Sequence, residues 1–286
     1  HRPLICFAAC MAVGGDASKA LSAAAAIEHF HTAALIHDDI ADEAELRRGE
    51  PCLHLREGLG LAINVGDLGL QMVNGTVAKD PNLDDHTKVR VLTELIEMTK
   101  RTIEGQALDI GWARDGRYDI SPEDYLVMAT CKTAHYSGAV PLAIGAIIGG
   151  GTETQIEGLR NYGLDTGLAF QIQDDILDYS RSARTGKPAN NDLREGKITL
   201  PLIEVLEKCT PAEKLQLLDK LSQCKEDEAA VDFLQGVVEA TGGTAMAART
   251  MQTYIDRATS ILAKYADSPY RTALVNLCAY VAERDK

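Results

Sequence analysis

The sequence is poor in aromatic residues and contains no long hydrophobic run. Phe, Tyr and Trp together make up 5% of its 286 residues, with a single Trp among them. The most apolar stretch, residues 138–151, is interrupted by glycines and is shorter than the roughly 18 to 20 residues that a membrane-spanning helix needs. We therefore expect no stable membrane span, and since no signal peptide is visible, we expect a cytoplasmic protein.

The chain also lacks an excess of positive charge and any paired-cysteine motif. It carries 29 Lys and Arg against 42 Asp and Glu, and the net charge of −13 argues against a nucleic-acid partner, which would require a basic surface. This charge does not exclude a phosphorylated small molecule, because bound metal ions can invert the local charge. The seven cysteines are scattered and form no C-x-x-C pair, which indicates reduced thiols.

What the chain does contain is a series of apolar segments with helical spacing. Ala, the residue of highest helix propensity, is plentiful, and no stretch shows a convincing two-residue alternation typical of strands. We therefore predict one all-α domain over residues 1–286, and expect that residues preceding His1 are missing. The predicted helices include 20–44, 58–77, 84–112, one that begins at Ser121, 153–179, 200–207, 211–223, 226–241 and 243–284, the last broken near residue 268.

One stretch combines acidic and basic side chains in a pattern suited to a metal ion and a phosphate. Asp38 and Asp42 are four residues apart and Asp39 and Asp42 three apart, so on a helix they share a face, where bare carboxylates repel one another. Mg²⁺ would offset this repulsion, since it prefers oxygen ligands and is usually held by one or two carboxylates plus substrate phosphates. Arg47 and Arg48 follow at once, and arginine suits bidentate phosphate contact. The stretch indicates a diphosphate substrate.

A second stretch repeats the D-D-x-x-D spacing at Asp174, Asp175 and Asp178, again within an apolar helical segment. Lys187 and Lys197 follow in a loop. A single acidic cluster would be interpreted as a solvated helix face. Two clusters, each in an apolar helix and each followed by basic residues, instead indicate a site for a diphosphate and its metal ions.

These motifs, in this order, resemble those of the trans-prenyltransferases, the all-trans polyprenyl or geranylgeranyl diphosphate synthases. The matching segments spread over most of the chain: D-D-I-A-D-E-A-E-L-R-R-G-E-P from Asp38, K-T-A from Lys132, F-Q-I-Q-D-D-I-L-D from Phe170, and G-K…D-L-R-E-G-K-I-T-L-P ending at Pro201. The resemblance implies a single helical bundle of the class I isoprenoid synthase type, with its active-site cavity between core helices.

The resemblance also implies a reaction and its participants. Isopentenyl diphosphate would condense with an allylic diphosphate (dimethylallyl, geranyl or farnesyl) and extend it by five-carbon units through a metal-triggered allylic cation. The residues expected to form the site for Mg²⁺, as three ions with the diphosphate bound, are Asp38, Asp39, Asp42, Asp174, Asp175 and Asp178. Asp38, Asp42 and Asp174 would hold the ions, and Asp39, Asp175 and Asp178 would either bind them too or support the residues that do. The residues expected to bind the substrates are Arg2, His31, Arg47, Arg48, Lys132, Lys187 and Lys197. The expected catalytic residues, which would stabilise the cation or its leaving group, are Lys132, Thr133 and Gln171.

The isopentenyl diphosphate site matches the family pattern only in part. A G-G-K-x-x-R-P stretch is expected at the start of the chain, and only Arg2 and Pro3 are present. Arg2 could instead be a surface residue at a helix start. In the resemblance His31 and Arg48 complete this site, although His31 could equally be a histidine of the core.

Product length depends, in the resemblance, on the residues four and five positions before the first Asp. Here these are Ala34 and Ala33, whose small side chains would leave the hydrocarbon cavity open beneath them. We therefore expect geranylgeranyl diphosphate or a longer product. A bulky residue such as Phe30 or Met98 could still block the cavity.

Three other interpretations share some of these features. A class I terpene cyclase usually replaces the second Asp cluster by an Asn/Ser/Glu motif, and a non-catalytic partner subunit of a synthase tends to lose Asp residues from one cluster, whereas this chain retains both. A carboxylate metal-binding bundle of the di-iron type would carry Glu-x-x-His ligands, which are not evident here. Because relatives are commonly homodimers, we expect a homodimer.

Overall fold

The computed structural model describes residues 1–179 and 190–284, and this part of the chain is almost entirely helical. The first half comprises α1 (Arg2–Ala12), η1 (Ala17–Ala20), α2 (Leu21–Ala41), β1 (Leu46–Arg47), β2 (Glu50–Pro51), α3 (Leu53–Glu57), α4 (Leu59–Ala78), α5 (Asp85–Asp115), α6 (Pro122–Ala129), η2 (Thr130–Ala139) and α7 (Val140–Ile148). The second half comprises α8 (Glu153–Asp178), α9 (Asn191–Arg194), α10 (Leu200–Leu206), α11 (Pro211–Gln223), α12 (Glu228–Thr241), α13 (Gly243–Leu262) and α14 (Pro269–Glu283). The predicted all-α fold is confirmed.

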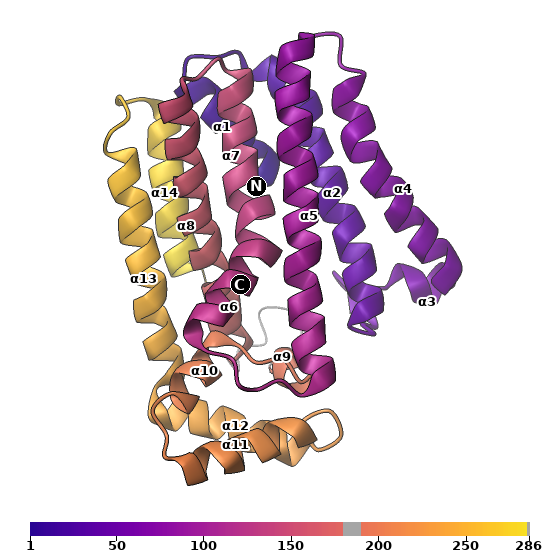
Figure 1. Cartoon of the computed structure of the whole chain (residues 1–286), viewed down its shortest axis with the longest axis vertical. Helices are drawn as coiled ribbons and strands as arrows, with labels where there is room; N and C mark the ends of the chain where they lie inside the picture. The colour runs from indigo at the N-terminus through magenta and orange to yellow at the C-terminus, as the bar shows by residue number, and fades with distance from the viewer. Residues whose placement is uncertain (180–189, 285–286) are drawn as a thin grey trace.

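The long helices stand side by side along the longest axis of the molecule (Figure 1). Helices α1, α2, α5, α7, α8, α13 and α14 share this direction, α4 lies at one edge beside α2, and α11 and α12 cross the lower end. The core between the long helices is apolar and fully buried at Ile27, Leu95, Ile144 and Leu159. Among the described helices, none combines the length and the hydropathy that crossing a membrane requires.

Several helices begin where capping residues predict. The Ser121 hydroxyl accepts a hydrogen bond from the Asp124 N–H, and the Asp124 carboxylate accepts one from the Ser121 N–H, which forms a reciprocal capping box at α6. The Asp84 carboxylate accepts a hydrogen bond from the Thr87 N–H at 2.8 Å and caps α5. The predicted starts of these two helices are confirmed, because satisfied N–H groups fix the first turn of a helix.

The helix that carries the first Asp cluster ends earlier than predicted. It stops at Ala41 rather than near residue 44, and Asp42 is its C-terminal capping residue. The chain then forms a short antiparallel ladder in which Leu46 pairs with Pro51. Arg48 lies in the turn of this hairpin in the left-handed region, with φ of 56°. This reversal folds the arginines back toward the carboxylates of α2.

The segment that carries Lys132 is a π-helix, where a regular helix was predicted. Its neighbours approach it at glycines. A Cβ atom at Gly105 of α5 would lie 2.2 Å from the backbone nitrogen of Lys132, and one at Gly138 of η2 would lie 2.1 Å from the carbonyl oxygen of Gly163 in α8. Such backbone contact is possible only without side chains, and it holds η2 between α5 and α8. Thr133 is thereby buried at the centre of the bundle.

Candidate active site

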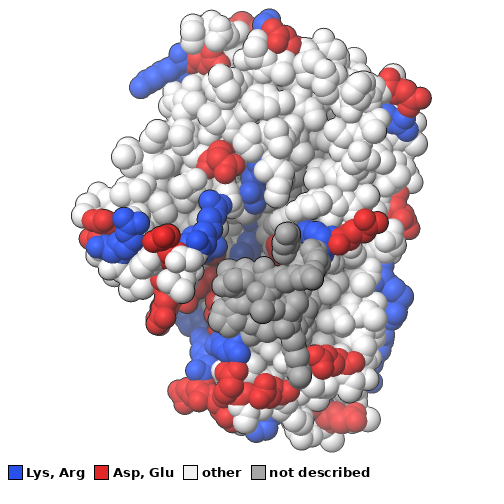
Figure 2. All heavy atoms as spheres, turned by 180° about the vertical axis from the view of Figure 1, so that it is seen from behind, with Lys and Arg blue, Asp and Glu red and all other residues white. Residues whose placement is uncertain are grey.

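A polar cavity of about 600 Å³ brings the two Asp clusters together. Asp38 and Asp42 from α2 and Asp174 and Asp178 from α8 all line it. The basic and catalytic candidates that also line it are Arg2, His31, Arg48, Lys132, Lys197, Thr133 and Gln171. Figure 2 shows acidic and basic side chains gathered around a hollow on one face of the molecule, while the upper part of that face is largely uncharged.

In the first cluster, two aspartates border the cavity and the third is buried behind its wall. Asp38 accepts a hydrogen bond from the Gln106 side chain at 2.8 Å, and Asp42 accepts one from the Lys197 ammonium at 2.9 Å. Asp39 is buried and bonded to the Arg47 guanidinium, whose Nε lies 2.9 Å from its carboxylate. Neither Asp39 nor Arg47 lines the cavity. Asp39 and Arg47 thus pair with each other behind the cavity wall, and their predicted roles toward the metal and the substrate stay predictions.

The second cluster divides in the same way. Asp175 is buried, and its carboxylate accepts hydrogen bonds from the Tyr125 hydroxyl at 2.6 Å, the Gln171 amide at 2.9 Å and the Leu200 N–H at 3.2 Å. Burial raises the pKa of Asp175 to about 7. Asp175 does not line the cavity, and both of its oxygens accept hydrogen bonds within the protein, which favours the supporting role over direct metal binding.

The remaining acids of this cluster also have partners. The two oxygens of Asp178 accept hydrogen bonds from the N–H groups of Asn191, at 3.0 Å, and Asp192, at 3.1 Å, at the start of α9. Asp174 pairs with the guanidinium of Arg284, beyond the end of α14. Burial and the nearby carboxylates of Asp178 and Asp175 raise the pKa of Asp192 well above its usual range. Carboxyl groups are therefore crowded on this side of the cavity, and the crowding favours the protonated form of Asp192.

The lysines form a buried network with their own acidic partners. The Lys132 ammonium lies 2.5 Å from Asp109, and the Lys197 ammonium lies 2.6 Å from Glu195 and 3.9 Å from Asp109. Burial alone would raise the pKa of Asp109, but Lys132 and Lys197 outweigh it and hold that pKa below its usual range. Lys187, the third predicted lysine, lies outside the described residues.

Thr133 and Gln171 meet across the interface between η2 and α8. The Thr133 hydroxyl donates a hydrogen bond of 2.6 Å to the Gln171 carbonyl oxygen, and the Gln171 amide donates to Asp175. This chain of bonds fixes the orientation of both side chains beside Lys132. The structure brings Thr133, Gln171 and Lys132 together at one cavity, and their catalytic role stays a prediction.

His31 and Arg2 lie at another side of the cavity. Burial and the neighbouring Arg2, Arg48 and Arg47 lower the pKa of His31 to about 4, so its ring is neutral near pH 7. The Nδ1 atom of His31 is buried and has no hydrogen-bond partner within the described residues. Arg2 is 8% exposed and contacts the cavity, so it is not a freely exposed surface residue at a helix start.

A second, more apolar cavity of about 390 Å³ adjoins the polar one and shares five residues with it. The shared residues are Leu35, Asp38, Lys132, Thr133 and Tyr136. Ala34 and Phe30 line the apolar cavity, whereas Met98 belongs to the core and does not. An anionic head held beside Asp38 could therefore extend a hydrocarbon tail along α2 toward Phe30.

Ala33 lies outside this cavity, contrary to the sequence expectation. It is 1% exposed and faces α4, where a Cβ atom at Gly69 would lie only 2.9 Å from the Ala33 Cβ atom. Adjacent residues of an α-helix point about 100° apart, and here Ala33 points toward α4 while Ala34 borders the cavity. Of these two alanines, Ala34 is the one that a bound hydrocarbon chain could contact.

Tyr136 and Glu195 are among the lining residues that were not predicted from the sequence. Tyr136 borders both cavities, and its spacing of three residues after Thr133 on a helical segment was an available signal. Glu195 borders the polar cavity beside Lys197. Glu195 is the glutamate of the D-L-R-E-G-K motif, so its place between Asp192 and Lys197 was an available signal.

The carboxylates fit a metal ion that completes its coordination with a ligand. Within the described residues, no three Asp, Glu, His or Cys side chains converge closely enough to hold an ion alone. Mg²⁺ rarely uses an all-protein cage and usually keeps waters and substrate phosphates. Carboxylates from two helices that border one cavity match that mode of binding.

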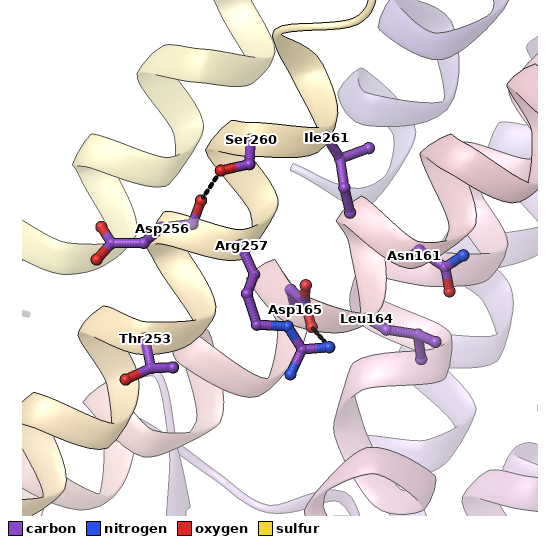
Figure 3. A pocket seen from close by; sticks show the side chains of 8 residues that line it. All are labelled: Asn161, Leu164, Asp165, Thr253, Asp256, Arg257, Ser260 and Ile261. Carbon is purple, nitrogen blue, oxygen red and sulfur yellow. Dashed lines mark hydrogen bonds and ion pairs between the residues drawn. The ribbon is translucent and has the colours of Figure 1, made fainter.

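Another pocket, of about 520 Å³, lies between α8 and α13 (Figure 3). Its buried carboxylate, Asp165, pairs with Arg257 at 3.2 Å, and burial raises the pKa of Asp165. Neither Asp cluster contributes to this pocket. The predicted chemistry therefore concentrates at the paired cavities near α2, η2 and α8.

An all-helical bundle in which two acidic helices face one cavity, joined to an apolar cavity, is a class I isoprenoid synthase fold. The polyprenyl synthetase family model matches residues 1–238. The chain belongs to the polyprenyl synthetase family, and it is a prenyltransferase that elongates isoprenoid chains.

Individual relatives agree with this assignment. The short chain isoprenyl diphosphate synthase of Methanothermobacter thermautotrophicus is 37% identical over 285 residues, covering 99% of this chain and 86% of that protein. The crystal structure of geranylgeranyl pyrophosphate synthetase from Pyrococcus horikoshii superposes with a TM-score of 0.90 at 32% identity, covering 99% of this chain and 85% of that one. Geranylgeranyl pyrophosphate synthase from Corynebacterium glutamicum, complexed with isoprenyl diphosphate and magnesium, has a TM-score of 0.88 at 29% identity, covering 99% and 86%.

Proposed function

We propose that the enzyme condenses isopentenyl diphosphate with an allylic diphosphate to give geranylgeranyl diphosphate or a longer all-trans product. The observation that carries this proposal is the convergence of Asp38, Asp42, Asp174 and Asp178 on a polar cavity that continues into an apolar one. The polar cavity suits a diphosphate, and the apolar cavity suits the chain attached to it. The relatives named as geranylgeranyl diphosphate synthases support the same range of products.

The carboxylates that border the cavity would hold Mg²⁺. Asp38, Asp42 and Asp174 are the proposed ligands, as part of a set of three ions that the diphosphate completes, and Mg²⁺ bound there would neutralise the charge on the leaving diphosphate. Asp39 and Asp175 would instead hold neighbouring groups in place, the first through Arg47 and the second through Gln171. The magnesium in the related Corynebacterium glutamicum complex supports this choice of ion.

The basic residues would bind the diphosphate groups. Lys132 and Lys197 border the cavity and are charged, since their acidic partners raise the pKa of each despite burial. They would hold the allylic diphosphate, while Arg2, His31 and Arg48 would hold isopentenyl diphosphate on the opposite side. The neutral ring of His31 would act as a hydrogen-bond partner rather than as a cation.

The chemical step needs no protein nucleophile. The bond between the allylic carbon and its oxygen breaks, and the electron pair leaves with the diphosphate. The Thr133 hydroxyl and the Gln171 amide would stabilise the allylic cation through their dipoles. The double bond of isopentenyl diphosphate attacks the cation, and a proton then passes from the new carbon chain to the released diphosphate. The apolar walls exclude water, which would otherwise quench the cation.

A homodimer would bury the exposed apolar faces of α4 and α5. On α5, Val89, Ile96, Ile103 and Ile110 recur every seven residues, and each is more than a third exposed. Leu61, Val65, Leu68 and Met72 are similarly exposed on α4. Large exposed apolar surfaces mark protein interfaces, which supports this choice of faces. Because Ile103 and Ile110 also border the apolar cavity, a second copy would cover that side of the site.

The dimer proposal is tested by measuring the mass of the protein in solution. Light scattering coupled to size-exclusion chromatography should give twice the chain mass for the wild type. Ile96→Lys should shift the protein toward the monomer, because it places a charge in the apolar stripe. Val127→Lys, at an exposed apolar position on α6, is the matched control and should remain dimeric. A monomeric wild type would contradict the proposal.

The reaction is tested by a product-length assay. Purified protein is incubated with Mg²⁺, labelled isopentenyl diphosphate and each allylic primer, and the dephosphorylated products are separated by chain length. Asp38→Asn and Asp174→Asn should each reduce kcat by about 100-fold or more. Asp115→Asn, at the exposed end of α5, should retain activity. No condensation with any primer would refute the proposal and favour a cyclase or a partner subunit.

A further inference from the structure

Tyr136 belongs to both cavities and is not part of any motif that identified the site. It lies on η2, three residues after Thr133, and borders the polar and the apolar cavity at once. A side chain in that place can contact both substrates. Its hydroxyl contacts Arg2 and its ring contacts Phe30, so the two parts of the side chain can have different roles.

The hydroxyl and the ring together hold Arg2. The Arg2 Nη2 group donates hydrogen bonds to the Tyr136 hydroxyl at 3.1 Å and to the Ser137 hydroxyl at 2.9 Å, and Nε donates to Ser137 at 3.2 Å. The guanidinium carbon also lies 4.6 Å from the centre of the Tyr136 ring, within the range of a cation–π contact. The guanidinium is thus oriented by two neighbouring residues of η2.

The hydrogen-bond partners of Arg2 are neutral, so its positive charge has no counter-ion among the described residues. Its hydrogen-bond acceptors among the described residues are hydroxyl oxygens, and no carboxylate of that part pairs with it. Leaving a buried cation without a counter-ion is costly, so such a group favours an anion. The Nη1 donors of Arg2 make no hydrogen bond with the described residues and remain available for a diphosphate.

The ring of Tyr136 also forms part of the hydrocarbon wall. Its centre lies 5.6 Å from that of Phe30, at an interplanar angle of 60°, in the tilted arrangement that aromatic pairs prefer. It lies 6.0 Å from the His31 ring in a stacked arrangement. Phe30 and Tyr136 both border the apolar cavity, so loss of the Tyr136 ring would widen that cavity.

We propose that Tyr136 is a positioning residue for isopentenyl diphosphate, acting through Arg2, and a residue that determines product length, acting through its ring. This inference rests on the proposed function, because it assigns Arg2 to that substrate. One side chain thereby connects the binding of each new five-carbon unit to the space into which the chain grows. The two roles are separable by substitution.

Three variants separate the roles. Tyr136→Phe removes only the hydroxyl and should raise the KM for isopentenyl diphosphate by about 5- to 10-fold, with kcat and product length unchanged. Ser137→Ala, the matched control, removes the other acceptor of Arg2 without touching the apolar cavity, and should act in the same direction. Tyr136→Leu should raise that KM and also shift the products toward longer chains. The KM for the allylic primer should stay unchanged in Tyr136→Phe and Ser137→Ala, which a general loss of structure would not produce.

A binding measurement distinguishes failure of this inference from failure of the proposed function. Calorimetric titration with isopentenyl diphosphate alone should show weaker binding to Tyr136→Phe than to the wild type, with equal thermal stability. If the wild type does not elongate but this difference holds, the function is wrong and the positioning role stands. Unchanged KM and affinity in both conservative variants would overturn the positioning role, and a wild-type product distribution in Tyr136→Leu would overturn the length role.

Discussion

Substituting Phe for Ala34 should shorten the product of this enzyme. Ala34 lies on α2 one turn before Asp38, and Phe30 lies one turn further back along the same cavity. Four residues of an α-helix rise about 6 Å, so Phe30 is about 12 Å from Asp38 along the axis. A benzyl group at position 34 would move the aromatic floor to about 6 Å from Asp38 and remove about half of this depth.

The lost depth sets the size of the expected change. The loss of about half of this depth should shorten the main product by at least one isoprene unit, for example from geranylgeranyl to farnesyl diphosphate. The first condensation should persist, because a short primer does not reach position 34. The KM for isopentenyl diphosphate should remain that of the wild type, because Arg2 and Tyr136 are unchanged.

Ala33→Phe is the matched control on the neighbouring position. Ala33 faces Gly69 in a contact that leaves no room for an aromatic ring, so this variant should lose about 1 to 3 kcal/mol or more of unfolding free energy through overpacking. It should not produce a defined shorter product. Comparing Ala34→Phe with Ala33→Phe therefore distinguishes the effect of filling the cavity from the effect of damaging the packing between α2 and α4.

The assay is the chromatographic separation of dephosphorylated products at equal turnover, with denaturant unfolding measured on both variants. Shortening by Ala33→Phe with retained stability, and an unchanged distribution for Ala34→Phe, would refute the reasoning. That result would mean that the growing chain lies along the opposite side of α2.

Three further predictions concern the buried charges and the glycine contacts. Lys132→Met should cost about 3 to 5 kcal/mol of stability, because it leaves Asp109 buried, and adding Asp109→Asn should recover stability but not activity; recovery of both would assign Lys132 a structural role. The pKa of His31 is about 4 in the folded state against an ordinary 6.5, so between these pH values the unfolded state binds one proton more than the folded state. The unfolding free energy should therefore fall as the pH is lowered from 6.5 to 4. His31→Gln should flatten this part of the profile of unfolding free energy against pH, and a profile identical to that of the wild type would contradict the lowered pKa. Gly138→Ala should lower the unfolding free energy by about 3 kcal/mol or more, whereas Gly236→Ala, which meets open space, should be neutral or stabilising in the same denaturant titration.

The helical fold and the location of the site were predictable, because both depend on short-range patterns. Helical spacing and capping residues such as Ser121 and Asp84 act within a few positions of the chain. The π-helix at η2 was not predictable, since it depends on backbone contacts such as that of Gly138 with Gly163, distant in sequence. The early end of α2 also depends on a contact after a chain reversal, between Arg47 and Asp39.

The division of labour within each Asp cluster follows from helix geometry once the partners are known. Residues i and i+4 point within about 40° of each other, whereas residue i+1 points about 100° away. In both clusters the i and i+4 carboxylates border the cavity, and they are Asp38, Asp42, Asp174 and Asp178. The i+1 carboxylates, Asp39 and Asp175, are buried and bonded to groups of the protein. The sequence shows the spacing but not the direction of the cavity, so it could not decide which acids turn inward. Because both clusters show the same arrangement, we infer that the second Asp of each motif supports the cavity wall, and that the first and last Asp face the ligand.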